Sequence, residues 1–161
     1  LIAIVGPGFW KESFASYVRN RAPEVAKNIT AVAMVSSGGV QGVGEALRSG
    51  VLGKVMERNR IAVETQAVEK VLARLGSQQG DVTYGPDNVE KAVTYGAVEE
   101  LLVTDRFLRE SPDNERRHLE NLMRDVERMK GKILIVNAEH EAGQKLTALG
   151  GAAALLRFRV E

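Results

Sequence analysis

The chain has 161 residues, of which 44% are hydrophobic and 27% charged, with a formal net charge of +1 and no cysteine. This composition is typical of one ordinary domain or two small ones with a buried core. No apolar run approaches the roughly 18 residues that a transmembrane helix needs, and the lack of cysteine excludes disulfides and thiolate metal ligands. We therefore expect a cytoplasmic protein without a membrane span.

Charge is divided unevenly along the chain. Residues 1–80 carry ten Lys or Arg against six Glu, a net charge of +4, whereas residues 81–161 carry twelve basic against fifteen acidic residues, a net charge of −3. The split indicates two domains with different partners, and nucleic acid would suit the first. Ordinary variation between two small domains explains the same numbers.

The first 80 residues predict an α/β domain. An apolar strand over Leu1–Val5 is followed by the glycine turn Gly6–Lys11 and a helix, and a second strand is expected over Ile29–Val35. Because the chain begins inside a strand and without methionine, we expect the opening part of this domain to be missing. Helices are expected after the second strand over residues 42–48, 51–58 and 63–75.

The turn Gly6–Lys11 lies between a strand and a helix, an arrangement that can cradle phosphate on backbone N–H groups. Its spacing matches neither the P-loop nor the dinucleotide-binding fingerprint. We favour a tight structural turn with aromatic residues packed beneath it, and keep a phosphate- or nucleotide-binding α/β enzyme as an alternative. The candidate RNA-binding residues are Lys11 in this turn and Lys54, Arg58 and Arg60 later, although a solvated helix face is the commoner reason for such a cluster.

The small polar stretch Ser77–Gly80 predicts a linker. We therefore place a domain boundary near residue 80, which gives domains over residues 1–80 and 81–161. The predicted fold class is α/β, with two small domains of three or two layers each.

The second domain begins with a helix that leads into a buried strand. Pro86 suits the first turn of the helix, and Gly96 suits a left-handed cap at its end. Leu101–Val103 is a short apolar run with β-branched character, typical of a buried strand. Helices and strands then alternate, with Ser111 as the expected N-cap of one helix, up to a last strand that begins at Ala152.

Residues and spacing alone predict no catalytic mechanism. The chain has two histidines, His118 and His140, and neither belongs to an HExxH motif. The adjacent residues Glu139, His140 and Glu141 do not share one helical face, so we expect no metal site there. A Gly-x-Ser-x-Gly elbow is also missing from the sequence.

Six sequence blocks of the second half follow one another in the order Tyr84-Gly85, Val89–Ala92, Tyr95–Glu99, Leu101–Val103, Glu139–Leu146 and Leu149–Phe158. Together they resemble the C-terminal domain that the Pelota family shares with the eukaryotic and archaeal class-1 release factors. In the first half, the strand before Gly6–Phe9 resembles the corresponding strand of the Pelota central domain, and Ser36–Gly39 with the helices after it follow in the same order. The resemblance thus covers essentially the whole chain.

Two features favour the Pelota family over the release factors. The turn Pro7-Gly8-Phe9 has the Pelota form, and the segment between Thr104 and Ser111 is short, whereas release factors carry a sizeable insertion there. The Gly-Gly-Gln loop of a release factor would lie upstream of Leu1. A fragment of a class-1 release factor, which promotes peptidyl-tRNA hydrolysis, is therefore kept as an alternative.

The resemblance implies a ribosome-rescue and mRNA-surveillance factor that acts by binding. Such a factor recognises stalled ribosomes, promotes their dissociation and takes part in no-go decay. The implied partners are the ribosome, a translational GTPase (elongation factor 1-alpha in archaea) and an ABC-type recycling ATPase.

The resemblance also implies a GTPase contact near the end of the chain. In the related release factors, a Gly-Ile-Leu-Arg-Tyr segment helps to bind the GTPase. The matching residues here are Ala154, Leu155, Leu156, Arg157 and Phe158, with Ala for Gly, Leu for Ile and Phe for Tyr. A buried last strand with Arg157 at its edge explains Leu155 and Leu156 equally well.

The family has been credited with a divalent-metal-dependent endoribonuclease activity, attributed to its N-terminal domain. Nothing in these 161 residues would support that chemistry. We therefore expect no cofactor in this chain and no cleavage of RNA by it when purified. Metal-dependent cleavage by the chain alone would contradict this expectation.

Overall fold

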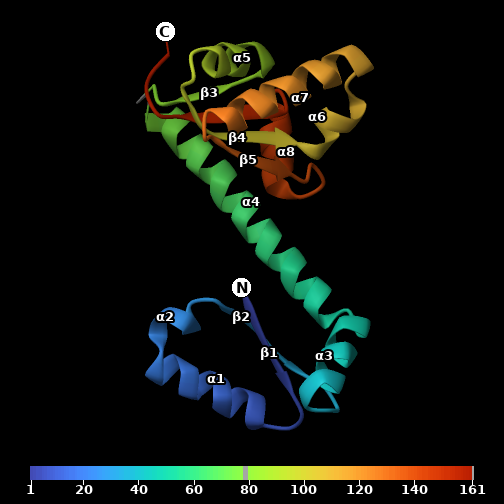
Figure 1. The fold of residues 1–161 in the computed structure, drawn as a ribbon. Helices are drawn as coiled ribbons and strands as arrows, with labels where there is room; N and C mark the ends of the chain where they lie inside the picture. Colours follow the sequence, from blue (N-terminus) through green and yellow to red (C-terminus); the bar gives the residue numbers. More distant parts are fainter. Residues whose placement is uncertain (78–79, 161) are drawn as a thin grey trace. The chain divides into compact units, whose positions relative to one another are not determined.

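The computed structural model describes residues 1–77 and 80–160 (Figure 1). Residue contacts divide the chain into two compact units, Leu1–Arg60 and Ile61–Glu161. The predicted α/β class is confirmed, but the division between the units lies at residue 60 rather than near residue 80. The predicted linker Ser77–Gly80 includes residues 78 and 79, which lie outside the described residues. Within the described ranges, no helix is both long and apolar enough to span a membrane.

The first unit contains two parallel strands with helices packed against them. Its elements are β1 (Ile2–Gly6), α1 (Trp10–Arg21), α2 (Pro23–Ala26), β2 (Ile29–Met34), α3 (Gly39–Arg48) and the start of α4 (Val51–Ser77). Strand β1 pairs with β2 from Ile2 opposite Ile29 to Gly6 opposite Met34. Both predicted strands are therefore confirmed to within a residue.

The helix predictions between residues 42 and 75 are wrong in detail. Residues 51–58 and 63–75 belong to one continuous helix, α4, because residues 59–62 contain neither glycine nor proline to interrupt its hydrogen bonds. Helix α3 begins at Gly39 rather than at Gly42. Its Glu45 carboxylate accepts a hydrogen bond from the backbone N–H of Ser36 at 2.8 Å, which holds the preceding loop against the helix.

The aromatic residues around the glycine turn are exposed and do not pack beneath it as predicted. Phe9, Trp10, Phe14 and Tyr17 each expose more than half of their surface. The rings of Phe9 and Trp10 stack on each other, with centroids 5.1 Å apart. The buried residue of α1 is the small Ala15, so the aromatic side chains do not form a core beneath the turn.

The second unit is a three-layer α/β fold. After the remainder of α4, its elements are β3 (Val82–Tyr84), α5 (Pro86–Thr94), β4 (Val98–Thr104), α6 (Asp105–Glu110), α7 (Asp113–Arg128), β5 (Lys132–Val136), α8 (Glu141–Ala148) and β6 (Ala152–Leu156). The sheet has the order β3-β6-β4-β5, with β4 parallel to β5 and β6 antiparallel to both of its neighbours. Strand β3 is absent from the elements predicted above, because three residues are too few to show a period.

Both faces of this sheet are buried, and alternate residues of its central strands point to opposite cores. Leu101 and Val103 of β4 pack in one core with residues of α5 and α7, whereas Leu102 packs in the other with residues of α4 and α8. Strand β6 alternates in the same way. Figure 1 shows the sheet of this unit between these helices. A strand buried on both faces reads as a continuous apolar run, which is why these strands could be predicted.

The helical stripe predicted over residues 63–75 explains where the units divide. Ala67, Val68 and Val71 of α4 are buried against Leu102 and other residues of the second unit. Val63, the first residue of the predicted stripe, is exposed. The second part of α4 is thus a structural layer of the second unit, which moves the boundary from residue 80 to residue 60.

The helix-end predictions in the second unit are mixed. Pro86 is the first residue of α5, and Gly96 follows that helix with a φ of 66°, as predicted. Ser111 does not cap α7: its hydroxyl donates to the carbonyl of Phe107 at 2.6 Å and closes the end of α6. Helix α7 begins at Asp113 without a side-chain cap.

Candidate functional site

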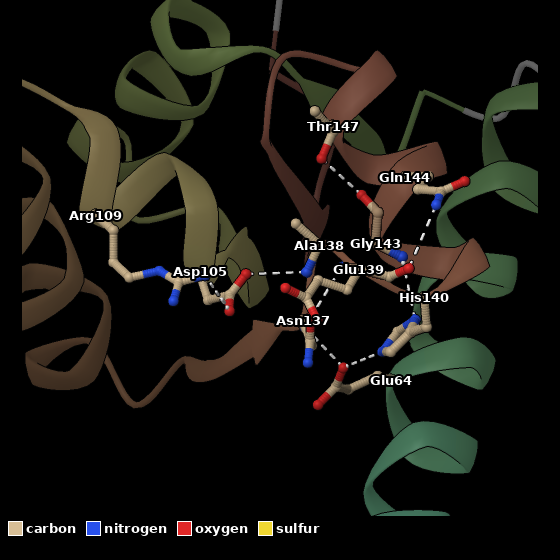
Figure 2. Close-up of polar contacts among 10 residues, drawn as sticks. All are labelled: Glu64, Asp105, Arg109, Asn137, Ala138, Glu139, His140, Gly143, Gln144 and Thr147. Atoms are coloured by element: carbon tan, nitrogen blue, oxygen red, sulfur yellow. Dashed lines mark hydrogen bonds and ion pairs between the residues drawn. The ribbon is translucent and has the colours of Figure 1, made fainter.

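A buried carboxylate on α4 holds the loop between β5 and α8. Glu64 exposes only 1% of its surface. Its Oε2 atom accepts a hydrogen bond from the backbone N–H of Asn137 at 2.8 Å and lies 2.5 Å from Nε2 of His140. Figure 2 shows both contacts meeting at this one oxygen. A carboxylate with so little access to water needs such partners, because its desolvation is costly.

The two ring nitrogens of His140 have different partners. Nδ1 accepts a hydrogen bond from the backbone N–H of Gly143 at 3.4 Å and thereby caps α8. A ring nitrogen that accepts carries no proton, so Nε2 bears the ring proton and donates it to Glu64. These contacts hold the imidazole in one orientation and engage both of its nitrogens.

Gly143 permits this close packing of α8 on the loop. A Cβ atom at this position would lie 1.9 Å from the carbonyl oxygen of Asn137 and 2.7 Å from Cα of Ala138. Both distances are below the 3.0 Å at which real Cβ atoms essentially never approach another atom. Further along the helix, the hydroxyl of Thr147 donates to the carbonyl of Gly143 at 2.7 Å (Figure 2).

A second carboxylate, from α6, holds the same loop. Asp105 accepts a hydrogen bond from the backbone N–H of Ala138 at 2.9 Å and pairs with Arg109 at 3.0 Å. The side chain of Asn137 accepts one from the N–H of Glu139 at 2.8 Å. Three successive backbone N–H groups, at residues 137 to 139, are thus satisfied by side chains, which fixes the loop in one conformation.

This polar network is structural rather than catalytic. Both nitrogens of His140 are occupied by protein groups, so neither can take a proton from a substrate or bind a metal ion without breaking the network. The neighbouring Glu141 pairs with Lys145 at 2.7 Å, and this hydrogen bond lowers the pKa of the Glu141 carboxyl. Across residues 1–77 and 80–160, no three or more His, Asp or Glu side chains are grouped to hold a metal ion.

The five residues of the implied GTPase contact are divided between the core and the surface. Ala154, Leu155 and Leu156 lie in β6 and expose at most 3% of their surface. Arg157 and Phe158 follow the strand and are exposed. Only these two can present their side chains to a partner, and the three buried residues shape the strand that positions them.

Arg157 is anchored at two points. Its backbone N–H donates to the carbonyl of Ala97 at 2.8 Å, and its guanidinium donates to the carbonyl of Met129 at 2.7 Å. Met129 is the C-cap of α7, and a cation at this end of a helix is favourable. The guanidinium therefore lies over the end of α7 in a defined orientation.

Residues from three elements surround Arg157 and Phe158. Tyr95, the C-cap of α5, exposes 64% of its surface and shares a hollow of about 270 Å³ with Phe158 and Arg159. Met129 and Lys130 lie exposed at the end of α7. We call this set of six residues the Arg157 surface: Tyr95, Met129, Lys130, Arg157, Phe158 and Arg159.

The candidate RNA-binding residues do not form one cluster. Lys54 and Arg58 lie one turn apart on α4 and line a common hollow with β2, within the first unit. Arg60 is exposed but does not line that hollow. The ammonium of Lys11 is already engaged by the carbonyl of Gly8 and by Glu12, and its side chain is 9% exposed.

Sequence reasoning missed Glu64, although a signal for it exists. Glu64, Val68 and Val71 are spaced so that they share one helical face, and a carboxylate on an apolar face predicts a buried, hydrogen-bonded group. Tyr95 and Met129 were also missed. Their exposure depends on how the ends of α5 and α7 meet the segment after β6, which no local pattern encodes.

Comparison with known proteins connects this fold with one family. The family description "eRF1 domain 3" matches residues 61–160, and its start agrees with the division of the chain at residue 60. A pelota homolog from Thermococcus kodakarensis is 45% identical over 158 residues, which cover 98% of this chain and 43% of that relative. The chain therefore spans less than half the length of the curated relatives that it matches.

Two solved structures are similar over nearly the whole chain. A structure of ribosome-bound archaeal Pelota and ABCE1 matches with a TM-score of 0.79 at 43% identity, covering 99% of this chain and 43% of the other. Dom34 from S. cerevisiae, described as a translation termination-like factor that interacts with Hbs1, matches with a TM-score of 0.71 at 26% identity. That match covers 99% of this chain and 47% of Dom34.

Proposed function

Because the chain belongs to the eRF1 domain 3 family and within it to the Pelota proteins, we propose that it acts in ribosome rescue and mRNA surveillance. The observation that carries this proposal is the match to pelota homologues over both units rather than over one motif. The polar network supports action by binding, because its groups satisfy one another and leave no general base free. We propose that the chain needs no cofactor and acts in the cytoplasm, including in no-go decay.

The proposed partners are the ribosome, a translational GTPase and an ABC-type recycling ATPase. The matched archaeal Pelota structure is ribosome-bound and contains ABCE1, and the matched Dom34 is described as interacting with Hbs1. We extend these partners to this chain, which spans less than half the length of the matched relatives. Elongation factor 1-alpha is the GTPase that we propose for an archaeal chain.

We assign the GTPase contact to Arg157 and Phe158. Both are exposed directly after the buried strand β6, and Arg157 is held in place by its bond to the carbonyl of Met129. A side chain that is oriented before binding loses less conformational entropy when the complex forms. The remaining residues of the segment, Ala154 to Leu156, act through the core.

Binding of purified elongation factor 1-alpha to the chain tests this assignment. Arg157→Ala and Phe158→Ala are each expected to weaken binding by roughly tenfold or more, the usual effect of truncating an interface anchor. Phe158→Ala breaks no hydrogen bond of the fold, so it separates binding from folding. Thermal unfolding verifies that Arg157→Ala is folded. Undiminished binding by both folded variants would remove this segment from the contact.

We propose that Lys54 and Arg58 contact ribosomal RNA. They share one face of α4 beside a hollow, whereas the ammonium of Lys11 is engaged within its own turn. Co-sedimentation with ribosomes should weaken in Lys54→Gln/Arg58→Gln and lose part of its salt dependence. Lys27→Gln, which removes a cation already paired with Glu24, is the matched control. Equal binding by the double variant and this control would contradict the assignment.

Two other functions are less well supported. A class-1 release factor would require a Gly-Gly-Gln loop, which these 161 residues do not contain, and a search for it in any gene sequence upstream of Leu1 tests this alternative. A phosphate-binding enzyme would use the turn Gly6–Lys11, but Lys11 already contacts Gly8 and Glu12. Titration with nucleotide is expected to show no saturable binding. Incubation of RNA with the chain and divalent metal is likewise expected to show no cleavage.

A further inference from the structure

The basic residues of the Arg157 surface differ from most other arginines of the second unit. Five of those arginines form ion pairs with carboxylates. They are Arg74 (3.0 Å), Arg106 (3.8 Å), Arg109 (3.0 Å), Arg116 (2.6 Å) and Arg128 (3.3 Å). Among the described residues, no carboxylate lies within ion-pair distance of Arg157, Arg159 or Lys130. Three cations that the fold leaves without a carboxylate can accept one from a partner.

Large apolar side chains lie exposed beside these cations. Tyr95 exposes 64% of its surface, Phe158 51% and Met129 40%. Tyr, Phe, Met and Arg are the residue types that are enriched at protein interfaces, where rigid aromatic groups often supply most of the binding energy. Five of the six residues of the Arg157 surface belong to these types.

The surface has a rigid base and a place for one side chain. The base is rigid because Arg157 bonds the backbone of Ala97 and of Met129. The hollow between Tyr95, Phe158 and Arg159 has a volume of about 270 Å³. That is enough space for one apolar side chain with its neighbouring backbone.

The charge of the unit favours a protein partner over RNA. Residues 61–161 carry fourteen Lys or Arg against seventeen Asp or Glu, a net charge of −3. An RNA strand long enough to extend beyond the three cations would meet the acidic excess of the rest of the unit, whereas a short acidic segment can be confined to these cations. Met129, which is 40% exposed, suits contact with a protein side chain as well.

We propose that the Arg157 surface is a single docking site for an acidic segment of a partner protein, which seats one apolar side chain between Tyr95 and Phe158. The carboxylates of the segment pair with Arg157, Arg159 and Lys130. This inference rests on the proposed function in taking the translational GTPase as the partner. It adds Tyr95, Met129 and Arg159, which lie outside the segment 154–158, and it defines the chemistry that the partner must present.

Calorimetric titration of elongation factor 1-alpha into the 161-residue chain tests the site. Tyr95→Ala is expected to weaken binding by roughly 30-fold, as for a buried aromatic anchor. Tyr84→Ala removes a tyrosine of similar exposure, 46%, from the edge strand β3 and is the matched control. It is expected to bind within about twofold of the parent, since surface changes away from an interface are nearly neutral.

Charge reversal tests the acidic nature of the segment. Arg159→Glu should weaken binding more than Arg159→Gln, and both losses should shrink at high salt. Arg117→Glu changes another exposed arginine of the unit, on α7, and should leave binding unchanged.

The outcomes separate this inference from the proposed function. If Phe158→Ala weakens binding and Tyr95→Ala does not, the enlarged site is wrong and the GTPase contact stands. If Tyr95→Ala, Phe158→Ala and Arg157→Ala all bind like the parent, both the enlarged site and the GTPase contact are wrong. Equal losses in Tyr95→Ala and Tyr84→Ala would also overturn the site, as would equal losses in Arg159→Glu and Arg117→Glu. If Tyr95→Ala lowers affinity for a single-stranded RNA oligonucleotide and not for the GTPase, the surface binds RNA instead.

Discussion

Glu64 of α4 and Asp105 of α6 both accept hydrogen bonds from the loop between β5 and α8. Each takes a backbone N–H that the sheet does not use, from Asn137 and from Ala138. His140 then links Glu64 to the first turn of α8. At the scale of single residues, the fold around this loop therefore depends on acceptors supplied by two helices that are distant in sequence.

Removing the acceptor at residue 64 should destabilise the second unit. Glu64→Met keeps most of the side-chain volume but leaves the N–H groups of Asn137 and His140 without an acceptor, which costs about 2–4 kcal/mol in the free energy of unfolding. Glu64→Gln retains one oxygen that can accept both bonds and should lose clearly less. Urea denaturation measures both effects.

Glu69→Met, at an exposed position of the same helix, is the control and should be nearly neutral. Equal midpoints for Glu64→Met and Glu69→Met would show that the buried network does not stabilise the unit.

A methyl group at residue 143 should be far more harmful than helix propensity predicts. Alanine is favoured over glycine inside a helix by about 1 kcal/mol. At Gly143, however, its Cβ atom would lie 1.9 Å from the carbonyl oxygen of Asn137, so the loop or helix α8 must move. We expect Gly143→Ala to cost more than about 3 kcal/mol, as the more disruptive core changes do.

Gly76→Ala provides the comparison, since a Cβ atom at this position of α4 meets nothing within 4 Å. This change should stabilise the unit slightly. A loss in Gly143→Ala no larger than in Gly76→Ala, by thermal unfolding, would contradict the close approach of α8 to the loop.

At the scale of the elements, α4 and β6 each bury apolar side chains in the core of the second unit and are continuous with an exposed segment. Helix α4 runs through the division between the units and contributes Val68 and Val71 to the core of the second. Strand β6 is buried over its whole length and delivers Arg157 and Phe158 to the surface directly after it. In both elements the apolar pattern indicates burial. The residues proposed to bind partners, Lys54 and Arg58 on α4 and Arg157 and Phe158 after β6, lie outside that pattern.

The pair Glu141–Lys145 should make helix α8 sensitive to acid. The hydrogen bond from Lys145 lowers the pKa of the Glu141 carboxyl below its ordinary value. A carboxyl with a depressed pKa in the folded state contributes its stability above the unfolded-state pKa and loses it as the pH falls through the folded-state pKa. The contribution is therefore present at neutral pH and is lost in acid.

An NMR titration of the Glu141 carboxyl measures this effect directly. Its midpoint should lie lower in the parent than in Lys145→Gln, which keeps a polar side chain of nearly the same length but removes the charge. Identical midpoints in the two proteins would mean that the pair does not form in solution. Because both side chains lie at the surface, the difference should shrink at high salt.

At the scale of the whole molecule, the division of the chain at residue 60 makes a definite claim about folding. Val68 and Val71 are fully buried in the second unit, and together they contribute about 3–6 kcal/mol. This is comparable with the roughly 5–15 kcal/mol of stability that a whole domain has. The second unit should therefore require the last part of α4.

Two fragments of the chain distinguish a boundary at residue 60 from one near residue 80. Residues 61–161 should unfold cooperatively in urea, whereas residues 81–161 should lack a cooperative transition and bind a hydrophobic dye through the uncovered face of the sheet. Cooperative unfolding of 81–161 with the midpoint of the longer fragment would instead support a boundary near residue 80.

The local sequence pattern is sufficient to predict the strands that are buried on both faces and the helices that are bounded by proline or glycine. The apolar run Leu101–Val103 indicates a strand, Pro86 the start of a helix and Gly96 its end, because these properties belong to the residues themselves. The ordered sequence blocks likewise indicate the Pelota family by themselves, since their order and spacing are properties of the chain rather than of its fold.

Only the tertiary structure decided which elements cover one another. Periodicity shows that one face of α4 is apolar but not which sheet buries it, so residue 60 could not be recognised as the boundary. Two partners of Glu64, Asn137 and His140, lie more than 70 residues away in sequence. The Arg157 surface, too, exists only because the ends of α5, α7 and β6 meet in the folded unit.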